Sequence, residues 1–295
     1  MKFYCIITSY DKPYNKQSFA YLQEAATARG LEFVVLESDR FDYAQDMQQA
    51  LETPCILYRL SVSQQAGMLE VQLLRPGVTT LYRDSYAAMV RAYPWGNALR
   101  LQAAGLPIIP TVFNLVKDQE DRLPAYVAQL GGFPVILKAA GGSHGASVLR
   151  LDSEESLRSV LGFVTANTDA HFVLRKYIHD ATHLRMVVVG DTVADAIRYL
   201  PQPGDFRTNA VSVPEVEAFP ATADNAHLFE LAVQATQALG LDFGGVDLLL
   251  EADGAATIAE VNFPCNFSRN QMNTGVDVAG MIVDHLIAKS AASAA

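Results

Sequence analysis

Residues 243–266 read FGGVDLLLEADGAATIAEVNFPCN and predict two apolar strands joined by a tight turn. An Asp-Gly pair between apolar runs, here Asp253-Gly254, is typical of a two-residue type I′ hairpin, because both central residues need positive φ. Asp247 and Glu260 each lie six residues from this turn, so the hairpin places them directly opposite each other. Their Cβ atoms would then be about 4.5–5.5 Å apart on one face.

Asn262 follows Glu260 by two positions, so it shares that face with both carboxylates. Opposed like charges are destabilising unless a cation compensates them, and an all-oxygen set of this kind suits Mg²⁺. The alternative is a solvated polar face on an edge hairpin, and geometry alone does not separate the two. The opposite face is predicted to be core and carries Val246, Leu248, Leu250, Thr257, Ala259 and Val261.

The composition indicates a chain with a large core, since half of its 295 residues are hydrophobic. That length corresponds to about two domains of ~150 residues. The net charge of −10 disfavours nucleic acid or an anionic membrane as the main partner, because both bind basic surfaces. Cys5, Cys55 and Cys265 are scattered, which excludes a disulfide scaffold or zinc knuckle. With no signal-peptide pattern and no apolar run of ~20 residues, we expect a cytoplasmic protein.

Strands and helices alternate over the first 82 residues. This spacing predicts an open parallel sheet with helices on both faces, in which ligands bind beyond the carboxyl ends of the strands. The expected strands are residues 3–8, 33–36, 55–58 and 78–82, and the expected helices are 18–30, 43–51 and 62–74. The alternation stops near residues 83–93, where we expect a domain boundary.

Lys138 is the one charged residue in the apolar strand FPVILKAA, residues 133–140. A lysine that extends to solvent from a strand end is the simplest interpretation. The glycine-rich turn GGSHGAS, residues 141–147, favours another. Its backbone N–H groups could approach a phosphate chain, and Lys138 would add a positive charge.

Arginines suit phosphate and carboxylate recognition because the guanidinium is a planar fork. Arg185 and Arg198 lie on a second predicted hairpin around Gly190-Asp191, and Arg207 lies in the polar loop PGDFRTN that follows. Taken singly, each is more often a surface or salt-bridged residue. Further on, we expect a helix over residues 223–239 and a last helix that opens with the capping box Thr274-x-x-Asp277.

Several stretches from about residue 95 to the end resemble, in order, the RimK-like branch of the ATP-grasp ligases. They are FPVILKAAGGSHGASV, FVLRKYI, HLRMVVVGDTVADAIR, GDFRTN, ALGLDFGGVDLL, AEVNFPCNFSRN and TGVDVAGMIVDHL. The branch includes ribosomal-protein glutamate ligase and the amino-acid-to-carrier ligases of lysine and arginine biosynthesis. The resemblance implies an α/β protein with the ATP-grasp fold: a pre-ATP-grasp domain in residues 1–90, an N-terminal lobe in 91–176 and a C-terminal lobe in 177–295.

The resemblance also implies a reaction. ATP phosphorylates a carboxylate, an amine attacks the acylphosphate, and the amide, ADP and phosphate are released. The residues that match catalytic positions of the family are Arg185, Arg207 and Asn209. Those that match ATP-binding positions are Lys138, Gly141, Gly142, Ser143, His144, Gly145, Arg175, Lys176, Tyr177 and Ile178. Asp247, Glu260 and Asn262 match the ligands of Mg²⁺, with Mn²⁺ as the alternative metal.

The chain departs from the family pattern at several positions. Arg175-Lys176 stand where the interlobe hinge usually carries an acidic or amide residue, and His183 stands where an aspartate is usual. The ATP-binding lysine expected near residue 94 is absent. After Asn209, Ala-Val-Ser-Val replaces the His-Arg-Gly-Gly of the glutamate ligases, which weakens a ribosomal-protein substrate.

We therefore expect a carboxylate substrate and an amine acceptor, the latter being an amino acid, a peptide or the C-terminus of a carrier protein. We expect no nucleic acid or membrane partner, and a homo-oligomer. Two alternatives stay open: a peptide-modifying ATP-grasp enzyme of a natural-product pathway, and a catalytically inactive protein that binds ATP as a regulatory ligand.

Overall fold

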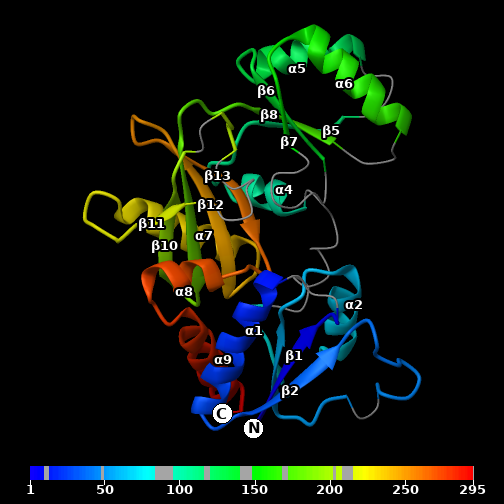
Figure 1. The fold of residues 1–295 in the computed structure, drawn as a ribbon, viewed down its shortest axis with the longest axis vertical. Coiled ribbons are helices and arrows are strands. Elements are labelled where there is room, and N and C mark those ends of the chain that lie inside the picture. The colour runs from blue at the N-terminus through cyan, green and yellow to red at the C-terminus, as the bar shows by residue number, and fades with distance from the viewer. Residues whose placement is uncertain are drawn as a thin grey trace.

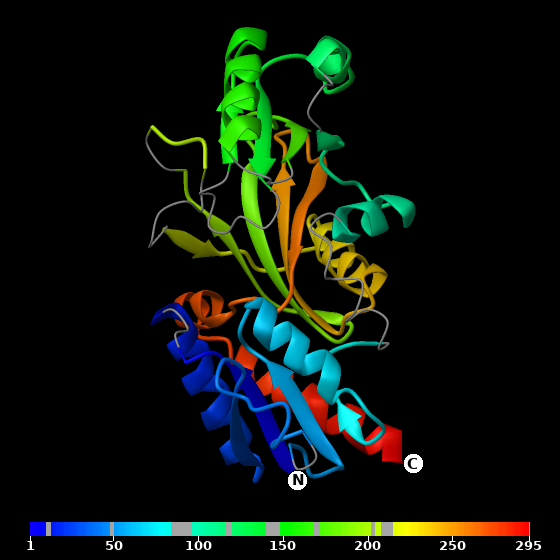
Figure 2. The same ribbon diagram turned by 90° about the vertical axis from the view of Figure 1, so that its right-hand side faces the viewer.

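The described strands of the computed structural model form three sheets that follow one another along the long axis (Figures 1 and 2). We call them the N-terminal sheet, the central sheet and the outer sheet. The structure describes residues 1–9, 13–47, 50–83, 96–115, 120–139, 148–167, 172–201, 204–207 and 215–294.

The N-terminal sheet is parallel, with the strand order β2-β1-β3-β4, as the alternating pattern predicts. Its strands are β1 Lys2–Ile7, β2 Glu32–Glu37, β3 Cys55–Arg59 and β4 Val78–Thr79. Helix α2 (Gln64–Leu73) covers one face, and α1 (Pro13–Ala28) covers the other together with α9 (Val278–Ala294) from the end of the chain (Figure 1). The C-terminal helix is therefore part of the same core as the first strands.

Lys289 on α9 fixes this return of the chain. Its ammonium group donates to the carbonyl oxygens of Thr80 and Tyr82 and to the carboxylate of Asp242, at 2.5–2.9 Å. These partners belong to the segment after β4 and to the residue before the central hairpin. One side chain thus connects the N-terminal sheet, the central sheet and α9.

The central sheet is antiparallel, with the order β11-β10-β9-β12-β13. Helix α7 (Ala226–Ala238) packs on the sheet, and α8 (Ser268–Thr274) follows β13. Its strands are β9 Thr182–Val189, β10 Thr192–Tyr199, β11 Val216–Ala218, β12 Phe243–Leu250 and β13 Ala256–Asn262. Residues 243–266 thus supply two neighbouring strands of the largest described sheet.

The outer sheet is also antiparallel, with the order β5-β8-β6-β7. One face is apolar and packs against α5 (Leu123–Gln129) and α6 (Glu154–Asn167), which lie above the sheet in Figure 1. The other face carries Lys138 and Arg175 toward the central sheet, because residues alternate between faces along a strand. The strands are β5 Thr111–Leu115, β6 Val135–Ala139, β7 Val148–Leu151 and β8 Phe172–Lys176, with α4 Gly96–Ala103 and the 3₁₀ turn Glu120–Arg122 nearby.

The turn of the central hairpin differs from the predicted one. A two-residue turn would have paired the residues next to Asp253-Gly254, but Glu251 donates its N–H to the Ala255 carbonyl at 2.8 Å across three turn residues. Gly254 has a φ of 90°, which is the left-handed glycine that closes such a three-residue hairpin. Asp-Gly suits both turn lengths, so the sequence left this choice open.

A β-bulge then restores the predicted pairing of the two carboxylates. Leu248 pairs with Ile258, whereas Asp247 pairs with Glu260, so Ala259 is an extra residue in β13. The longer turn and the bulge each shift the register by one residue in opposite directions. Asp247 therefore faces Glu260, as predicted, through two deviations that cancel.

The bulge also changes which residues face the core. Ile258 is buried, with 2% of its surface exposed, and it replaces Thr257 and Ala259 on the face predicted to be apolar. The predicted capping box is wrong as well. The carboxylate of Asp277 accepts the N–H of Gly280 at the start of α9, whereas Thr274 is the last residue of α8.

Other expectations differ in smaller ways. Residues 43–47 form turns rather than the start of the predicted helix 43–51, and β11 and α8 were not predicted. The boundary expected near 83–93 falls almost wholly outside the described residues. In the part of the chain that the structure describes, no helix is long and apolar enough to cross a membrane.

A buried ion pair ties β3 to α2. Arg59 Nε lies 2.6 Å from Glu70 Oε2, and the Tyr82 hydroxyl donates to the same oxygen at 2.7 Å. Only 8% of Arg59 and 2% of Glu70 are exposed. The guanidinium also lies 5.4 Å from the ring centre of Phe263, directly after β13. This pair therefore holds the N-terminal sheet against the end of the central hairpin.

We expect Glu70→Leu to lower the free energy of unfolding by about 3–5 kcal/mol, because it leaves Arg59 buried without its counter-charge. The double variant Arg59→Met/Glu70→Leu should lose less, since no uncompensated charge remains. Urea denaturation of the three proteins measures both values. A double variant less stable than Glu70→Leu would contradict this account.

Candidate functional site

Asp247 is the buried centre of the site, with 4% of its surface exposed. Arg185 on the neighbouring strand β9 binds it with two hydrogen bonds, Nε to Oδ1 at 2.6 Å and Nη2 to Oδ2 at 2.9 Å. His183 Nε2 lies 3.2 Å from Oδ1, and Asn262 donates its amide to Oδ2 at 3.0 Å. The cation that two opposed carboxylates require is thus supplied from within the sheet.

The electrostatics of this pair keep both partners charged. Burial alone would raise the pKa of Asp247, but the Arg185 charge, together with His183, outweighs it and lowers that pKa to about 2. Burial alone would likewise lower the pKa of Arg185, but the Asp247 carboxylate raises it above its usual value. The site therefore contains a fixed, ionised carboxylate at neutral pH.

Gly245 makes room for the arginine. A Cβ at this position would lie 2.9 Å from Arg185 Nη1 and 2.9 Å from the Cβ of Cys265. Glycine at this position therefore leaves room for the Arg185 guanidinium, which lies over Gly245 and binds Asp247. The side chain of Cys265 is buried beside Gly245.

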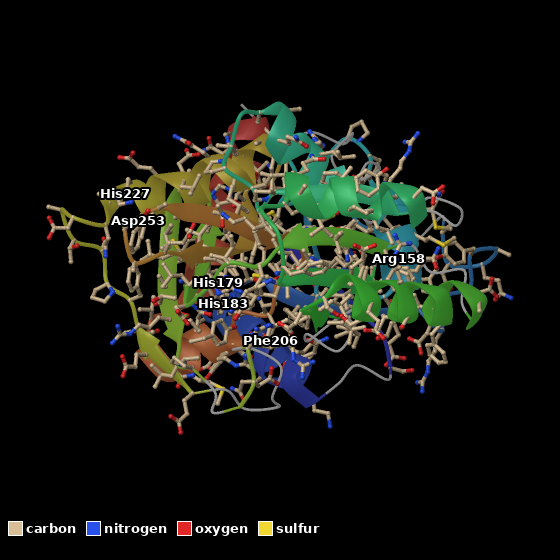
Figure 3. The ribbon with its side chains drawn as sticks, turned by 90° about the horizontal axis from the view of Figure 1, so that it is seen from above. Arg158, His179, His183, Phe206, His227 and Asp253 are labelled. Carbon is tan, nitrogen blue, oxygen red and sulfur yellow. The ribbon has the colours of Figure 1, made fainter. Side chains whose placement is uncertain are left out.

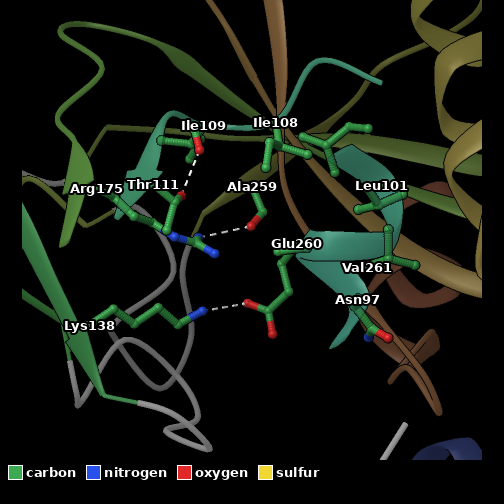
Figure 4. Close-up of a pocket in the computed structure, with 12 residues that line it drawn as sticks. Asn97, Leu101, Ile108, Ile109, Thr111, Lys138, Arg175, Ala259, Glu260 and Val261 are labelled. Carbon is green, nitrogen blue, oxygen red and sulfur yellow. Dashed lines mark hydrogen bonds and ion pairs between the residues drawn. The ribbon is translucent and has the colours of Figure 1, made fainter. Parts of the chain in front are cut away.

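Glu260 meets Lys138 across the gap between the central and outer sheets. The Lys138 ammonium lies 2.9 Å from Glu260 Oε2, and 44% of the Glu260 side chain is exposed (Figure 4). The residue proposed to bind phosphate and the residue proposed to bind metal thus touch each other. They line a pocket that is partly open to solvent. Its other lining residues are Asn97, Ala98, Leu101, Ile108, Ile109, Thr111, Arg175, Ile258, Ala259 and Val261.

Arg175 makes a second contact between the two sheets. Its Nη1 donates to the carbonyl oxygen of Ala259 at 3.0 Å (Figure 4). Ala259 is the bulged residue of β13, so its carbonyl lies outside the regular pairing with β12. Burial lowers the pKa of Arg175, and the Glu260 charge offsets this only in part.

The predicted hinge segment, residues 175–178, begins within β8 and continues past its end. The Lys176 N–H donates to the Pro110 carbonyl at 3.0 Å, and Ile178 is buried. The Tyr177 ring lies between Arg150, whose guanidinium is 4.8 Å from its centre, and Phe206, whose ring centre is 6.2 Å away. The His179 ring is 4.7 Å from that of Tyr177.

Arg207 lies in the loop next to Phe206. Its guanidinium binds the Asp205 carboxylate, with Nη2 to Oδ2 at 2.9 Å and Nε to Oδ1 at 3.0 Å. The described part of this loop thus contacts the hinge segment through Phe206. Asn209, the other predicted residue of the loop, lies outside the described residues.

The structure brings six of the predicted site residues together. Lys138, Arg175, Arg185, Asp247, Glu260 and Asn262 converge where β6, β8, β9, β12 and β13 meet. The predicted phosphate loop residues Gly141, Gly142, Ser143, His144 and Gly145 lie outside the described residues. Sequence reasoning noticed His183 only as a departure from the family. Its spacing of two residues from Arg185 could have placed both on one face of β9.

The donor set fits a hard divalent cation by its chemistry. Two carboxylates and an amide share one face, and Asp247 stays ionised. A carboxylate has about four lone-pair sites, and the contacts to Asp247 from Arg185, His183 and Asn262 reach that number. Glu260 is therefore the carboxylate best placed to take a metal, and Asp247 would join only by releasing one donor. Among the described residues, no cluster of three or more His, Cys, Asp and Glu side chains could hold a metal ion.

This arrangement of sheets and polar residues matches a known family. The RimK-like ATP-grasp domain matches residues 97–286, which include both sheets that line the pocket. The chain belongs to the RimK-like ATP-grasp family. The predicted family and the predicted ATP-grasp fold are both confirmed.

Relatives by sequence carry the name "probable alpha-L-glutamate ligase". One from Xanthomonas oryzae pv. oryzae is 34% identical over 203 residues, which are 68% of this chain and 66% of the relative. Another from Pectobacterium carotovorum subsp. carotovorum is 29% identical over 206 residues, which are 69% of this chain and 65% of the relative. The match thus leaves about a third of each relative's length uncovered.

Among solved structures, the ATP-grasp ligase PsnB has a TM-score of 0.73 and 20% identity, and the match covers 98% of this chain and 100% of that one. That protein was solved with a minimal precursor, and in another structure with the precursor, Mg and ADP. At this identity the likeness shows the fold alone. It extends the ATP-grasp match to the N-terminal sheet, which the family domain does not include.

We expect Asp247→Asn to lower the free energy of unfolding at pH 7 by about 3–5 kcal/mol, because it leaves Arg185 buried without its counter-charge. The pKa of Asp247 is lower in the folded protein than the ~3.9 of an unfolded chain. The stability that ionised Asp247 contributes is therefore complete above about pH 3.9 and is lost as the pH falls toward 2. The difference in the free energy of unfolding between wild type and variant should therefore be smaller at pH 3 than at pH 7 by about 1 kcal/mol. Urea denaturation at both pH values measures it, and an unchanged difference would contradict the pairing.

Proposed function

We propose that the chain is an ATP-dependent carboxylate–amine ligase that forms an amide through an acylphosphate and releases ADP and phosphate. The observation that carries this proposal is the contact of Lys138 with Glu260 across the two sheets, next to the ionised Asp247. A cation suited to phosphate and a carboxylate suited to Mg²⁺ thus meet at one pocket, and Asp247 pairs with that carboxylate across β12 and β13. Phosphoryl transfer depends mainly on positioning and charge neutralisation, which such a pocket provides.

Each residue has a distinct task in this proposal. Lys138 would leave Glu260 and bind phosphate oxygens of ATP, while Glu260 and Asn262 would hold Mg²⁺. The chemistry that the metal supplies when bound is neutralisation of phosphate charge. Asp247 holds Arg185 in place, and the remaining guanidinium edge of Arg185 neutralises the phosphoryl group that moves to the carboxylate.

The remaining predicted residues complete the nucleotide site. Residues 141–145 cover the phosphates, and residues 175–178 form the hinge beside the adenine. Arg207 and Asn209 lie near the acylphosphate. We further propose a pre-ATP-grasp domain in residues 1–90, an N-terminal lobe in 91–176 and a C-terminal lobe in 177–295.

The name of the sequence relatives favours L-glutamate as one of the two substrates. The second substrate is then an amino acid, a peptide or a protein C-terminus. ATP supply and the three scattered cysteines favour the cytoplasm. A homo-oligomer is part of the proposal, and size-exclusion chromatography with light scattering tests it.

Mg²⁺-dependent ADP formation is the direct test. We expect glutamate with a suitable partner to stimulate it, and Glu260→Gln to reduce it at least a hundredfold while the fold is kept. Glu154→Gln, a surface glutamate on α6, is the matched control and should retain full activity. Retained turnover in Glu260→Gln would refute the metal assignment.

The same assay separates the alternatives. ATP binding without ADP formation for any carboxylate and amine would refute the ligase and favour a regulatory ATP-binding protein. Stimulation by a precursor peptide, but not by free amino acids, would favour a peptide-modifying enzyme.

A further inference from the structure

Arg175 carries an unusual set of contacts for a half-buried cation. One of its N–H groups, on Nη1, binds the backbone carbonyl of Ala259. Its Nε is enclosed by protein, and no acceptor for it occurs among the described residues. A buried donor without an acceptor costs about 1–3 kcal/mol, so the described protein residues do not fully satisfy this guanidinium.

The charges around the pocket point to an anion. Its described lining contains two cations, Lys138 and Arg175, and one carboxylate, Glu260, which already binds Lys138. The positive charge of Arg175 is thus only partly compensated. The pocket gains most from a ligand that brings negative charge and hydrogen-bond acceptors.

The sheet geometry places both cations on the same side. Arg175 on β8 pairs with Ile136 on β6, and Lys138 lies two residues further along β6. Paired residues point to one face and residues two apart share it, so Arg175 and Lys138 are diagonal neighbours facing the pocket. Figure 4 shows both side chains extending from the outer sheet toward β13.

The bulge in β13 fixes the position of the guanidinium. Ala259 is the extra residue of the bulge, and its carbonyl accepts the bond from Nη1. A guanidinium held at one nitrogen can direct its other N–H groups at a phosphate with little loss of side-chain entropy. The anchor thus orients Arg175 without neutralising it.

We propose that the side chain of Arg175 is a second phosphate-binding cation of the nucleotide pocket, oriented by the bulge carbonyl of Ala259 and acting beside Lys138. This inference rests on the proposed function, since it takes the anion to be the polyphosphate of ATP. It also accounts for the lysine missing near residue 94, because Arg175 supplies a cation to the pocket from another strand.

The test compares the affinities of ADP with Mg²⁺ and of adenosine for wild type, Arg175→Gln and Arg175→Lys by calorimetry. Loss of one charge-assisted hydrogen bond to phosphate should weaken ADP binding by about tenfold to a hundredfold. Adenosine binding should change by less than about twofold. Arg175→Lys should fall between wild type and Arg175→Gln.

Arg158→Gln is the matched control. Arg158 lies on α6, on the far side of the outer sheet from the pocket, where it pairs with Glu154 (Figure 3). This variant should bind both ligands as wild type does. An equal loss of ADP and adenosine binding in Arg175→Gln would assign the residue a structural role and overturn the proposal, as would an unchanged ADP affinity.

A measurement on the wild type covers the case in which Arg175→Gln fails to fold. In protein labelled with ¹⁵N-arginine, the Nε–H signal of Arg175 is identified as the one missing from Arg175→Lys. On addition of tripolyphosphate this signal should shift, and exchange of its hydrogen with water should slow. An unaffected signal would overturn the proposal. ADP binding that depends on Arg175 without any turnover would instead refute the ligase and leave the Arg175 inference standing, whereas a wild type that binds no ADP would refute both.

Discussion

The ion pair between Asp247 and Arg185 is the constraint on which the site depends. A carboxylate buried in the middle of a sheet is unfavourable unless a cation and hydrogen bonds compensate it. Arg185 provides both, and Gly245 is the residue that lets it reach across. This ion pair joins β9 to β12. On the other side of β12, Asp247 pairs with Glu260 of β13, whose carboxylate lines the pocket.

The contacts between the outer and central sheets involve the same groups that the proposed ligand would use. Lys138 binds Glu260, and Arg175 binds the carbonyl of Ala259. A nucleotide with its metal would exchange the first contact for stronger ones and add to the second. In this account, binding of the ligand and closure of the pocket are therefore coupled, because one set of side chains serves both.

The sequence predicted the fold well where the signal is local. The alternating apolar runs give the parallel N-terminal sheet, and the spacing around Asp253-Gly254 gives the pairing of Asp247 with Glu260. It could not predict the bulge, because Ala259 has no residue type that marks one and Asp-Gly suits two turn lengths.

Contacts between strands that are distant in the sequence also could not be predicted from the sequence. The hydrogen bonds of Arg185 depend on β9 lying beside β12, and those of Arg175 depend on how the outer and central sheets meet. The resemblance to the family named the right positions, but only the three-dimensional arrangement shows that the side chain of Arg175 faces the pocket.

A crystal structure with Mg²⁺ and a non-hydrolysable ATP analogue tests the central claim most directly. The account predicts that the Lys138 ammonium leaves Glu260 for a phosphate oxygen, and that the Glu260 carboxylate coordinates the metal. An analogue bound elsewhere, with the 2.9 Å contact between Lys138 and Glu260 intact, would contradict it.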